Sequence, residues 1–494
     1  MALNQYTPEE PISSIATALA PAALGIVRVS GKGCIELVSK VFSRPKALLE
    51  APGNTIVYGW VVEPKSVVVE PKSVVVEPVE TTSRKIDEVM CAVYRAPKSY
   101  TGEDMVEIFC HGGPAVVTAI QNLMLRSGFR QANRGEYTFR AYINGKTDLT
   151  KAEAVREIID SHTDDSRSHA AGRLAGALYQ EIDSIKKLIV DTLAAIEVEI
   201  EYPEDEETIA DTFDKGDLEK AEQRLSSLVA SWKGEKLYQD GARVVLAGRT
   251  NAGKSSLFNA ILKEERAIVS DIEGTTRDWL ESWASINGIP VRLFDTAGLR
   301  QTDDVIEAKG VEISRNLVHE ADLVLYLIDS AEGMNEEDKD FIETCQVPLI
   351  VVWNKCDKDS SIVPQVFEEN LVSSRSERLP EPVEGVAGSL SQAHVSAKTG
   401  TGLSDLFNQI EKILTSGLST ERQQAGLGSA RQKDAVAEAL ERVRHALEAA
   451  ADDYSLDAVV QDLEDALDSL GEVTGIVTPD DVLGSIFANF CVGK

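Results

Sequence analysis

A short glycine-containing segment has the residue types and the spacing of a phosphate-binding loop. Gly248 and Gly253 enclose four residues, and Lys254 and Ser255 follow directly, in the pattern GxxxxGK[ST]. Such glycines let backbone amides turn toward phosphate oxygens, and the N-terminus of the helix that follows adds partial positive charge. We expect Lys254 to reach the β- and γ-phosphates, which makes it a catalytic candidate, and the Ser255 hydroxyl to bind Mg²⁺.

Four further segments follow this loop in the order that a GTPase needs. Thr276 would bind Mg²⁺ when a γ-phosphate is present, and Asp295 would hold Mg²⁺ through water. The Asp357 carboxylate can accept hydrogen bonds from N1–H and the 2-amino group of guanine, a donor pair that adenine lacks. The expected nucleotide contacts are Asn251, Ala252, Gly253, Lys254, Ser255, Ser256, Ser270, Asp271, Ile272, Glu273, Gly274, Thr275, Thr276, Asp295, Thr296, Ala297, Gly298, Asn354, Lys355, Asp357, Ser396, Ala397 and Lys398.

The group that activates the attacking water is less obvious. Many small GTPases carry Gln directly after the DxxG segment, but here that position is Leu299, which cannot polarise water. Glu307 lies twelve residues after Asp295 and is acidic, so it is either the catalytic group or a solvated helix residue. Asn251 could offer its amide oxygen to a monovalent cation such as K⁺, or could only stabilise the turn.

The surrounding pattern predicts the elements that position these residues. Residues 242–414 alternate short apolar runs with helix-like stretches, which indicates a mostly parallel α/β sheet. Helical patterns lie on both sides, so we expect a discontinuous helical domain with the α/β domain inserted into it. The predicted organisation is an N-terminal α+β domain at 1–145, a first helical segment at 146–240, the GTPase domain at 241–414 and a second helical segment at 415–494.

Composition and charge exclude several classes of protein. The chain has 494 residues, six Cys and a net charge of −31, so neither a disulfide framework nor a generic phosphate-backbone binder is expected. The charge is near neutral through residue 150 and acidic beyond it. No apolar stretch reaches the roughly 20 residues of a membrane span, and the N-terminus has no basic targeting signal. We therefore expect no membrane association and a reducing, cytoplasmic location.

Two segments interrupt the pattern as insertions. The heptad Glu-Pro-Lys-Ser-Val-Val-Val occurs at 63–69 and again at 70–76, and a third copy begins at 77–80. The tetrapeptide Glu-Pro-Val-Glu returns at 381–384, in Ser-, Pro- and Gly-rich sequence near 359–391. Because Pro at every seventh residue interrupts strands and helices, we interpret both segments as surface loops.

The GTPase segments resemble those of translation-factor-related GTPases, which implies a Ras-like P-loop fold of six strands and five helices. The rest of the chain is similar to the MnmE (TrmE) family of tRNA modification GTPases. The resemblance rests on Ser-Tyr-Thr-Gly-Glu-Asp at 99–104, His-Gly-Gly-Pro at 111–114, Arg-Gly-Glu-Tyr-Thr at 134–138, residues 144–154 and the terminal Cys-Val-Gly-Lys. It covers residues 12–494 apart from the two insertions.

The resemblance implies ligands for particular residues. The family's K⁺ ligands fall on Asn251, Ser270, Ile272 (through its carbonyl) and Thr275, and its Mg²⁺ ligands on Ser255 and Thr276. Its catalytic carboxylate falls on Glu307. Its contacts to a 5-formyl- or 5,10-methylene-tetrahydrofolate-type cofactor fall on Arg28, Glu107, Lys146 and Lys494. Arg and Lys can pair with folate carboxylates, and Glu can accept from the pterin.

The resemblance also implies partners and a reaction. It implies a bacterial homodimer formed through the N-terminal domain, and a hetero-oligomer with an MnmG-like FAD protein. Together they would add an aminomethyl or carboxymethylaminomethyl group to C5 of the wobble uridine in certain tRNAs, with K⁺-dependent, dimerisation-activated GTP hydrolysis. The alternative is a ribosome-assembly or regulatory switch GTPase, which a basic C-terminal module would favour. The last 80 residues are instead acidic.

Two further residues keep less specific interpretations. Cys491 is either a nucleophile beside a tRNA base or a small apolar residue, so we leave it outside the catalytic set. His111 has no second His nearby in the sequence, and we interpret it as belonging to a turn near the folate pocket rather than to a metal site.

Overall fold

The structure, a computed structural model, divides the chain into two compact units. It describes residues 10–63, 84–201, 215–264, 280–295, 317–358, 390–416, 425–451 and 456–494. The first unit comprises Met1–Arg156 with Gly471–Lys494, and the second comprises Glu157–Leu470. The repeat at 63–80 and the loop near 359–391 lie almost wholly outside the described residues.

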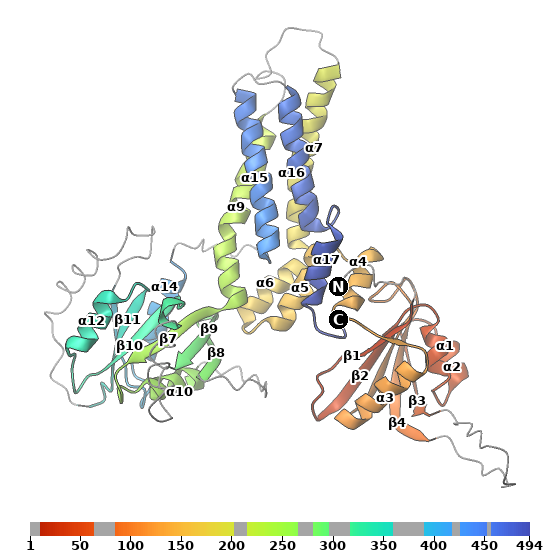
Figure 1. The fold of residues 1–494 in the computed structure, drawn as a ribbon, viewed down its shortest axis with the longest axis horizontal. Helices are drawn as coiled ribbons and strands as arrows, with labels where there is room; N and C mark the ends of the chain where they lie inside the picture. The colour runs from red at the N-terminus through yellow and green to blue at the C-terminus, as the bar shows by residue number, and fades with distance from the viewer. Residues whose placement is uncertain are drawn as a thin grey trace. The chain divides into compact units, whose positions relative to one another are not determined.

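A six-stranded sheet forms the body of the first unit (Figure 1). The strand order is β3-β4-β5-β2-β1-β6, and all pairs are antiparallel except β1 with β6. The strands are β1 Ile12–Ile15, β2 Ala22–Ser30, β3 Thr55–Val62, β4 Lys85–Tyr94, β5 Met105–Gly112 and β6 Arg130–Gln131. Alternate residues such as Val106, Ile108 and Cys110 are buried, as the two-residue period of a half-covered strand requires.

Helices cover the buried face of this sheet. They are α1 Cys34–Ser39, α2 Pro45–Leu49 and α3 Pro114–Arg126, and all three contribute to one apolar core with the strands. A second cluster joins α4 Glu136–Ile143 and α5 Leu149–Asp160 to α17 Asp480–Ala488, with Phe139 edge-to-face on Phe487 at 5.3 Å. The last residues of the chain are thereby fixed against residues from its first third.

The helical portion of the second unit is a bundle whose members come from distant regions of the sequence. It contains α6 Asp164–Leu174, α7 Ala177–Glu201, α9 Lys215–Asp240, α15 Ala430–Ala451 and α16 Leu456–Thr474. The helix α9 lies beside both α7 and α15, and ion pairs from Arg442 and His445 to Asp462 join α15 to α16 (Figure 1). The helical patterns predicted on both sides of the α/β region are therefore confirmed.

A buried ion network holds the base of this bundle. Arg173 of α6 donates to Glu157 of α5 and to Glu235 of α9, with N–O distances of 2.6 and 2.7 Å. His169 also contacts Glu235, and the backbone of Gly426 packs directly on the Glu235 carboxylate. Segments on both sides of the inserted domain therefore meet at Glu235.

The inserted α/β domain contains a second six-stranded sheet, in the order β12-β11-β10-β7-β9-β8. Its strands are β7 Ala242–Gly248, β8 Leu280–Ile286, β9 Ile289–Asp295, β10 Leu323–Asp329, β11 Leu349–Asn354 and β12 Leu390–His394. Among these strands only β8 pairs antiparallel, so the predicted mostly parallel sheet is confirmed. Its described helices are α10 Lys254–Glu264, α12 Glu336–Thr344 and α14 Leu403–Leu414.

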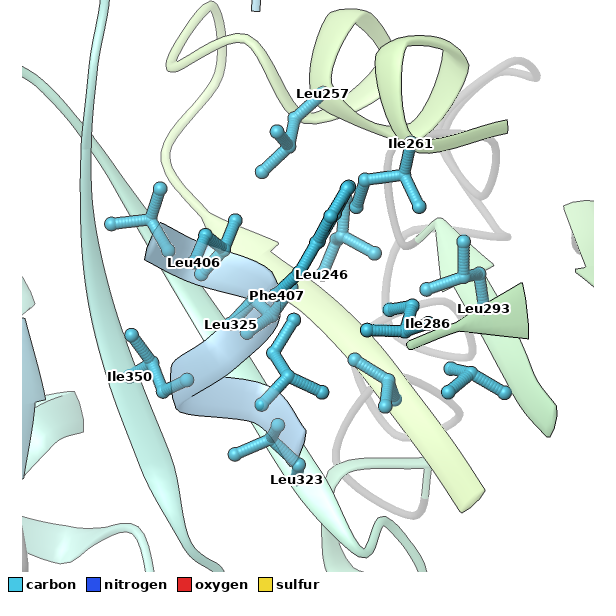
Figure 2. Close-up of a cluster of buried hydrophobic side chains, with 14 of the residues drawn as sticks. Leu246, Leu257, Ile261, Ile286, Leu293, Leu323, Leu325, Ile350, Leu406 and Phe407 are labelled. Atoms are coloured by element: carbon cyan, nitrogen blue, oxygen red, sulfur yellow. The ribbon is translucent and has the colours of Figure 1, made fainter. Parts of the chain in front are cut away.

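One apolar core fixes this sheet to the helices α10 and α14. Leu246 and Leu325 of the sheet meet Leu257 and Ile261 of α10 and Phe407 of α14 (Figure 2). Long apolar runs suit strands that are covered on both faces. This packing holds the carboxyl ends of β7, β9, β10 and β11 at one edge of the sheet, where ligands bind in open α/β sheets. Within the described residues, no helix is long and apolar enough to cross a membrane.

Candidate functional site

The predicted phosphate loop lies between the end of β7 and the start of α10. Gly248 and Gly253 have φ of 128° and 95°, and Asn251 has φ of 65°. A Cβ on Gly248 would lie 2.3 Å from the Leu327 carbonyl oxygen, and one on Gly253 would lie 2.2 Å from the Asn354 amide nitrogen. Both positions therefore require glycine because of conformation and of space, while Asn tolerates the left-handed region better than most residues.

Lys254 points back over this loop. Its Nζ donates to the carbonyl oxygens of Gly248 and Arg249, each at 2.8 Å, and the side chain is almost fully buried. The ammonium group is thus positioned within the curve of the loop, where the loop amides and the first turn of α10 would receive phosphate oxygens.

Ser255 and Asp295 meet although they lie forty residues apart. The Ser255 Oγ donates to Asp295 Oδ2 at 2.7 Å, and Asp295 is buried at the end of β9. A hydroxyl and a carboxylate are the hard oxygen donors that Mg²⁺ prefers. These two predicted residues therefore have the chemistry of a Mg²⁺ site at the phosphate end of α10.

Asn354 links the phosphate loop to the predicted base-binding segment. Its Nδ2 donates to the Ala252 carbonyl at 2.9 Å, and its Oδ1 accepts from the amides of Lys355 at 2.8 Å and Ala397 at 3.1 Å. The side chain is buried, so each of these groups depends on it for a hydrogen bond. Asn354 thus sets the distance between the phosphate-binding and base-binding segments.

The predicted guanine reader Asp357 is exposed and oriented by a buried hydroxyl. The Ser396 Oγ donates to Asp357 Oδ1 at 2.7 Å. This hydrogen bond is the main reason that the pKa of Asp357 lies below its usual value. The carboxylate is therefore held ionised and able to accept from two N–H groups of a base. Lys398 follows in the same loop, before α14.

Sequence reasoning missed Asp329, which ends the buried strand β10. Lys355 Nζ donates to Asp329 Oδ2 at 2.6 Å and to the Asn251 carbonyl at 2.7 Å. Burial raises the pKa of Asp329, but the hydrogen bonds from Lys355 and the Ala331 amide, together with the charges of Lys355 and Lys358, lower it overall. The signal was available, because an acid ends an apolar strand whose parallel neighbour ends at Asn354.

Several predicted site residues lie outside the described residues, and their roles remain predictions. They are Ser270, Asp271, Ile272, Glu273, Gly274, Thr275, Thr276, Thr296, Ala297, Gly298 and Glu307.

A second candidate site lies on the sheet of the first unit. Arg28 of β2 is paired in register with Glu107 of β5, and its guanidinium donates twice to Glu107 Oε1, at 2.6 and 2.9 Å. The remaining nitrogen donates to the Gly493 carbonyl at 2.7 Å. The aromatic rings of Tyr100 and Tyr137 lie 5.9 and 5.6 Å from the guanidinium carbon. Three of the four predicted folate residues, Arg28, Glu107 and Lys494, are thereby brought into one region.

The lysines of this set have different surroundings. Lys494 is half-buried, and burial lowers its pKa, with a further lowering from Arg28 and an opposing effect from Glu107. Lys146 is exposed, and its Nζ donates to the Pro97 carbonyl at 2.9 Å. A cluster of cationic groups with one carboxylate suits a ligand that carries both acids and amide-like N–H groups.

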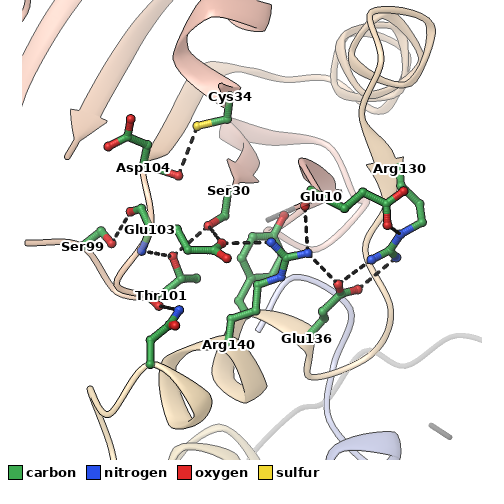
Figure 3. A network of polar contacts seen from close by, with 12 residues as sticks. Glu10, Ser30, Cys34, Ser99, Thr101, Glu103, Asp104, Arg130, Glu136 and Arg140 are labelled. Carbon is green, nitrogen blue, oxygen red and sulfur yellow. Dashed lines mark hydrogen bonds and ion pairs between the residues drawn. The ribbon is translucent and has the colours of Figure 1, made fainter. Parts of the chain in front are cut away.

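A polar network supports the strand that carries Arg28. Arg140, which is fully buried, donates to Glu103 at 2.9 Å and to Glu136 at 3.0 Å, and Ser30 donates to Glu103 at 2.9 Å (Figure 3). Arg130 adds a second pair to Glu136 at 2.6 Å. The segments 99–104 and 134–138, whose sequences are distinctive, thus hold the end of β2 against α4.

The two residues with open interpretations are placed as follows. His111 is exposed at the end of β5, and its Nδ1 lies 2.8 Å from Asp87. Cys491 is exposed, and its carbonyl accepts from the Gly135 amide at 3.4 Å. Across the described ranges of the chain, no group of three or more His, Cys, Asp or Glu residues is arranged to hold a metal ion.

Two family models match most of the chain. The model described as "MnmE helical domain" matches residues 149–491, and the model described as "GTP-binding protein TrmE N-terminus" matches residues 11–146.

Curated relatives match over their whole length. Proteins named "tRNA modification GTPase MnmE" from Treponema denticola and Treponema pallidum are 48 % and 42 % identical, and each alignment covers 100 % of both chains. The protein of that name from Borrelia turicatae is 37 % identical, over 99 % of this chain and 100 % of its own. Among solved structures, one of Aquifex aeolicus Era is 28 % identical over 41 % of this chain and 66 % of that chain, with a TM-score of 0.26.

Proposed function

This chain belongs to the MnmE family of tRNA modification GTPases, and on that premise we propose a K⁺-dependent GTPase that drives modification of the wobble uridine of certain tRNAs. The chain is a GTPase of tRNA modification. Our proposal concerns the ions, the catalytic carboxylate, the folate, the partners and the position modified. The single observation that supports it best is the phosphate loop, in which Lys254, Asn251 and Ser255 are fixed around one turn of backbone.

Mg²⁺ would be held by Ser255 and Thr276, with Asp295 acting through water. The hydrogen bond between Ser255 and Asp295 supports this assignment, because a cation would find both oxygens at one place. Mg²⁺ supplies charge neutralisation at the β- and γ-phosphates when bound. The chain's own contribution is to fix these oxygens on α10 and β9.

K⁺ would be held by the amide oxygen of Asn251, with Ser270, Ile272 and Thr275 as the other ligands. Two observations support Asn251: its left-handed backbone, and its carbonyl, which Lys355 already occupies. The Lys355 ammonium beside that carbonyl would repel a second cation there, which favours the side-chain oxygen as the donor. Without a Gln after DxxG, K⁺ would supply positive charge and Glu307 would orient the water.

GTP hydrolysis in KCl and in NaCl at equal ionic strength tests this mechanism. We expect a faster rate in KCl, and we expect Asn251→Ala to abolish the difference between the salts while Mg²⁺-dependent GDP binding persists. Glu307→Ala should lower kcat by about a hundredfold or more with GTP affinity retained, since general-base loss typically costs that much. Equal rates in both salts would refute the K⁺ mechanism and leave the GTPase assignment intact.

The first unit would hold the tetrahydrofolate-type cofactor and form a homodimer. The Arg28, Glu107 and Lys494 cluster supports the first role. For the second, the sheet face away from the helices exposes Ile56, Tyr58 and Met90, of which Tyr58 and Met90 are cross-strand partners. An exposed apolar patch on a sheet commonly marks an interface. Ile56→Lys should convert the dimer to a monomer in analytical ultracentrifugation, whereas a dimer that persists would refute this interface.

The tRNA reaction would require a flavoprotein partner like MnmG in the bacterial cytoplasm, with tRNA as the substrate of the complex. The net charge of −31 supports a division of labour, because acidic residues beyond 150 disfavour phosphate contacts by this chain alone. Nucleoside analysis of tRNA from a deletion strain tests the proposal. Loss of the C5 modification, restored by the wild-type gene and not by Glu307→Ala, is expected. Unchanged nucleosides would refute it.

A further inference from the structure

The phosphate loop is held on two sides, and only one of them belongs to the guanine-binding segment. On that side, Asn354 and Lys355 donate to the carbonyls of Ala252 and Asn251 at 2.9 and 2.7 Å. On the other side, the loop residue Arg249 extends toward the start of α12. No nucleotide-binding motif accounts for this second anchor.

The Arg249 guanidinium contacts the segment at the start of α12 with all three of its nitrogens. It donates to the Gly333 carbonyl at 2.7 Å, and its Nε lies 3.3 Å from Asp338 Oδ2, with Glu332 at 3.7 Å. An arginine that stabilises a transferring phosphoryl group must have free N–H groups directed at it. These contacts favour an attachment to α12 over that role.

Asp338 is a rigid partner for this attachment. It is fully buried, accepts from the Tyr326 hydroxyl at 2.8 Å and from the Asn335 amide at 2.9 Å, and forms a capping box with Asn335. Tyr326 lies on β10 in register with Ala247, one residue before the loop glycine Gly248. The acceptor is therefore fixed to the same sheet from which the loop emerges.

The backbone of Arg249 itself belongs to the nucleotide site. Its carbonyl accepts from Lys254 Nζ at 2.8 Å, so the side chain and the carbonyl of one residue join α12 to the phosphate-binding lysine. If the side chain were removed, rotation of the peptide after Arg249 would cost less, and the loop amides would no longer be held in one orientation. We propose that Arg249 is a positioning residue that orders the phosphate loop from the α12 side.

This role predicts that nucleotide affinity falls while kcat changes little. Loop amides contact the α- and β-phosphates, which GDP and GTP share. Arg249→Ala should therefore weaken both nucleotides alike, by about tenfold, as the loss of one to two charge-assisted hydrogen bonds would give. At saturating GTP, kcat should change by less than about threefold, because the variant weakens the binding of the substrate and of the transition state equally.

The experiment measures GDP and GTP affinity by fluorescent-nucleotide titration, and kcat at saturating GTP, on the full chain. Arg249→Lys should recover some of the affinity, since one ammonium can reach Gly333 or Asp338 but not both. Asp338→Asn should weaken GDP binding, and adding Arg249→Ala to it should weaken binding little further. Arg243→Ala is the matched control, because its partner Glu320 lies on the surface. Thermal unfolding of each variant identifies any that fails to fold.

Two outcomes would overturn the proposal. A fall in kcat of about a hundredfold or more with unchanged GDP affinity would make Arg249 a catalytic residue. GDP affinity equal to that of the Arg243→Ala control would make the attachment to α12 a purely structural contact.

Discussion

Replacing Arg173 by Leu should destabilise the helical bundle by about 3–5 kcal/mol, the usual cost of breaking a buried ion pair. Arg173 and Glu235 are 2 % and 4 % exposed, and Glu157 is 13 % exposed. Without the guanidinium, Glu235 keeps only His169 as a hydrogen-bonding partner among the contacts described above, and the Glu157 carboxylate loses its bond to Arg173. The matched control is Arg224→Leu, whose pair with Glu181 is 36 % and 28 % exposed and should contribute less than about 1 kcal/mol.

The same variant has a predicted pH dependence. In the native protein burial raises the pKa of Glu235, but the hydrogen bond from His169 and the charge of Arg173 lower it overall. In the wild type the ionised Glu235 carboxylate therefore contributes stability at every pH above its unfolded pKa. That stability is lost only as the pH falls through the lower pKa of the folded state. In Arg173→Leu, burial dominates and raises the pKa of Glu235. The Glu235 carboxylate therefore takes up a proton when the variant folds. The loss of unfolding free energy of Arg173→Leu relative to the wild type should then be larger at pH 8 than at pH 5.5.

Urea unfolding followed by helical circular dichroism at these two pH values measures both effects. A deficit as small as that of Arg224→Leu at both pH values would show that the network contributes little, and would refute the reasoning from burial. A deficit of about 3–5 kcal/mol that does not change with pH would confirm the packing argument and refute the account of the Glu235 pKa.

Three further predictions concern the GTPase domain. Asp357→Asn should weaken GTP binding by about a hundredfold or more, because a site built to accept two base N–H groups loses its acceptor, and titration of GTP against the variant measures this. Because the lowered pKa of Asp357 keeps its carboxylate ionised at about pH 5, Asp357→Asn should weaken GTP binding by the same factor at about pH 8 and at about pH 5, and a smaller factor at the lower pH would contradict it. Phe407→Ala should cost about 3–5 kcal/mol in urea unfolding, since the ring fills the core between sheet and helices, whereas the exposed Ser404→Ala should cost less than about 0.5 kcal/mol.

The local features of the site could be predicted from sequence because their chemistry is encoded in adjacent residues. A strand, a glycine loop and a helix follow one another at Gly248 and Lys254, and Asn354 ends a strand that Asp357 follows three residues later. The partners that hold these residues could not be predicted in the same way. Asp329 and Asp338 act through contacts to Lys355 and Arg249 that only the packing of β10, β11 and α12 brings about.

The candidate folate site shows the same limit at a larger scale. Arg28 and Gly493 are joined by a hydrogen bond across 465 positions of sequence. No period or motif predicts such a contact, and only the resemblance to a family placed Lys494 with Arg28. Likewise, Arg140 and Glu103 have the appearance of surface charges in the sequence, yet Arg140 is fully buried and Glu103 mostly so, because each satisfies the other.

The meeting of Glu235 with Gly426 has a consequence for how the chain is made. Residues on the two sides of the inserted domain come together there, so the bundle remains incomplete until residues near 470 have been synthesised. The inserted domain, by contrast, has all of its described strands within Ala242–Gly248 to Leu390–His394 and can fold while the ribosome is still translating the last helices. A GTP-binding domain would thus exist before the helical bundle is complete. Nucleotide bound during synthesis could then stabilise the nascent chain by mass action.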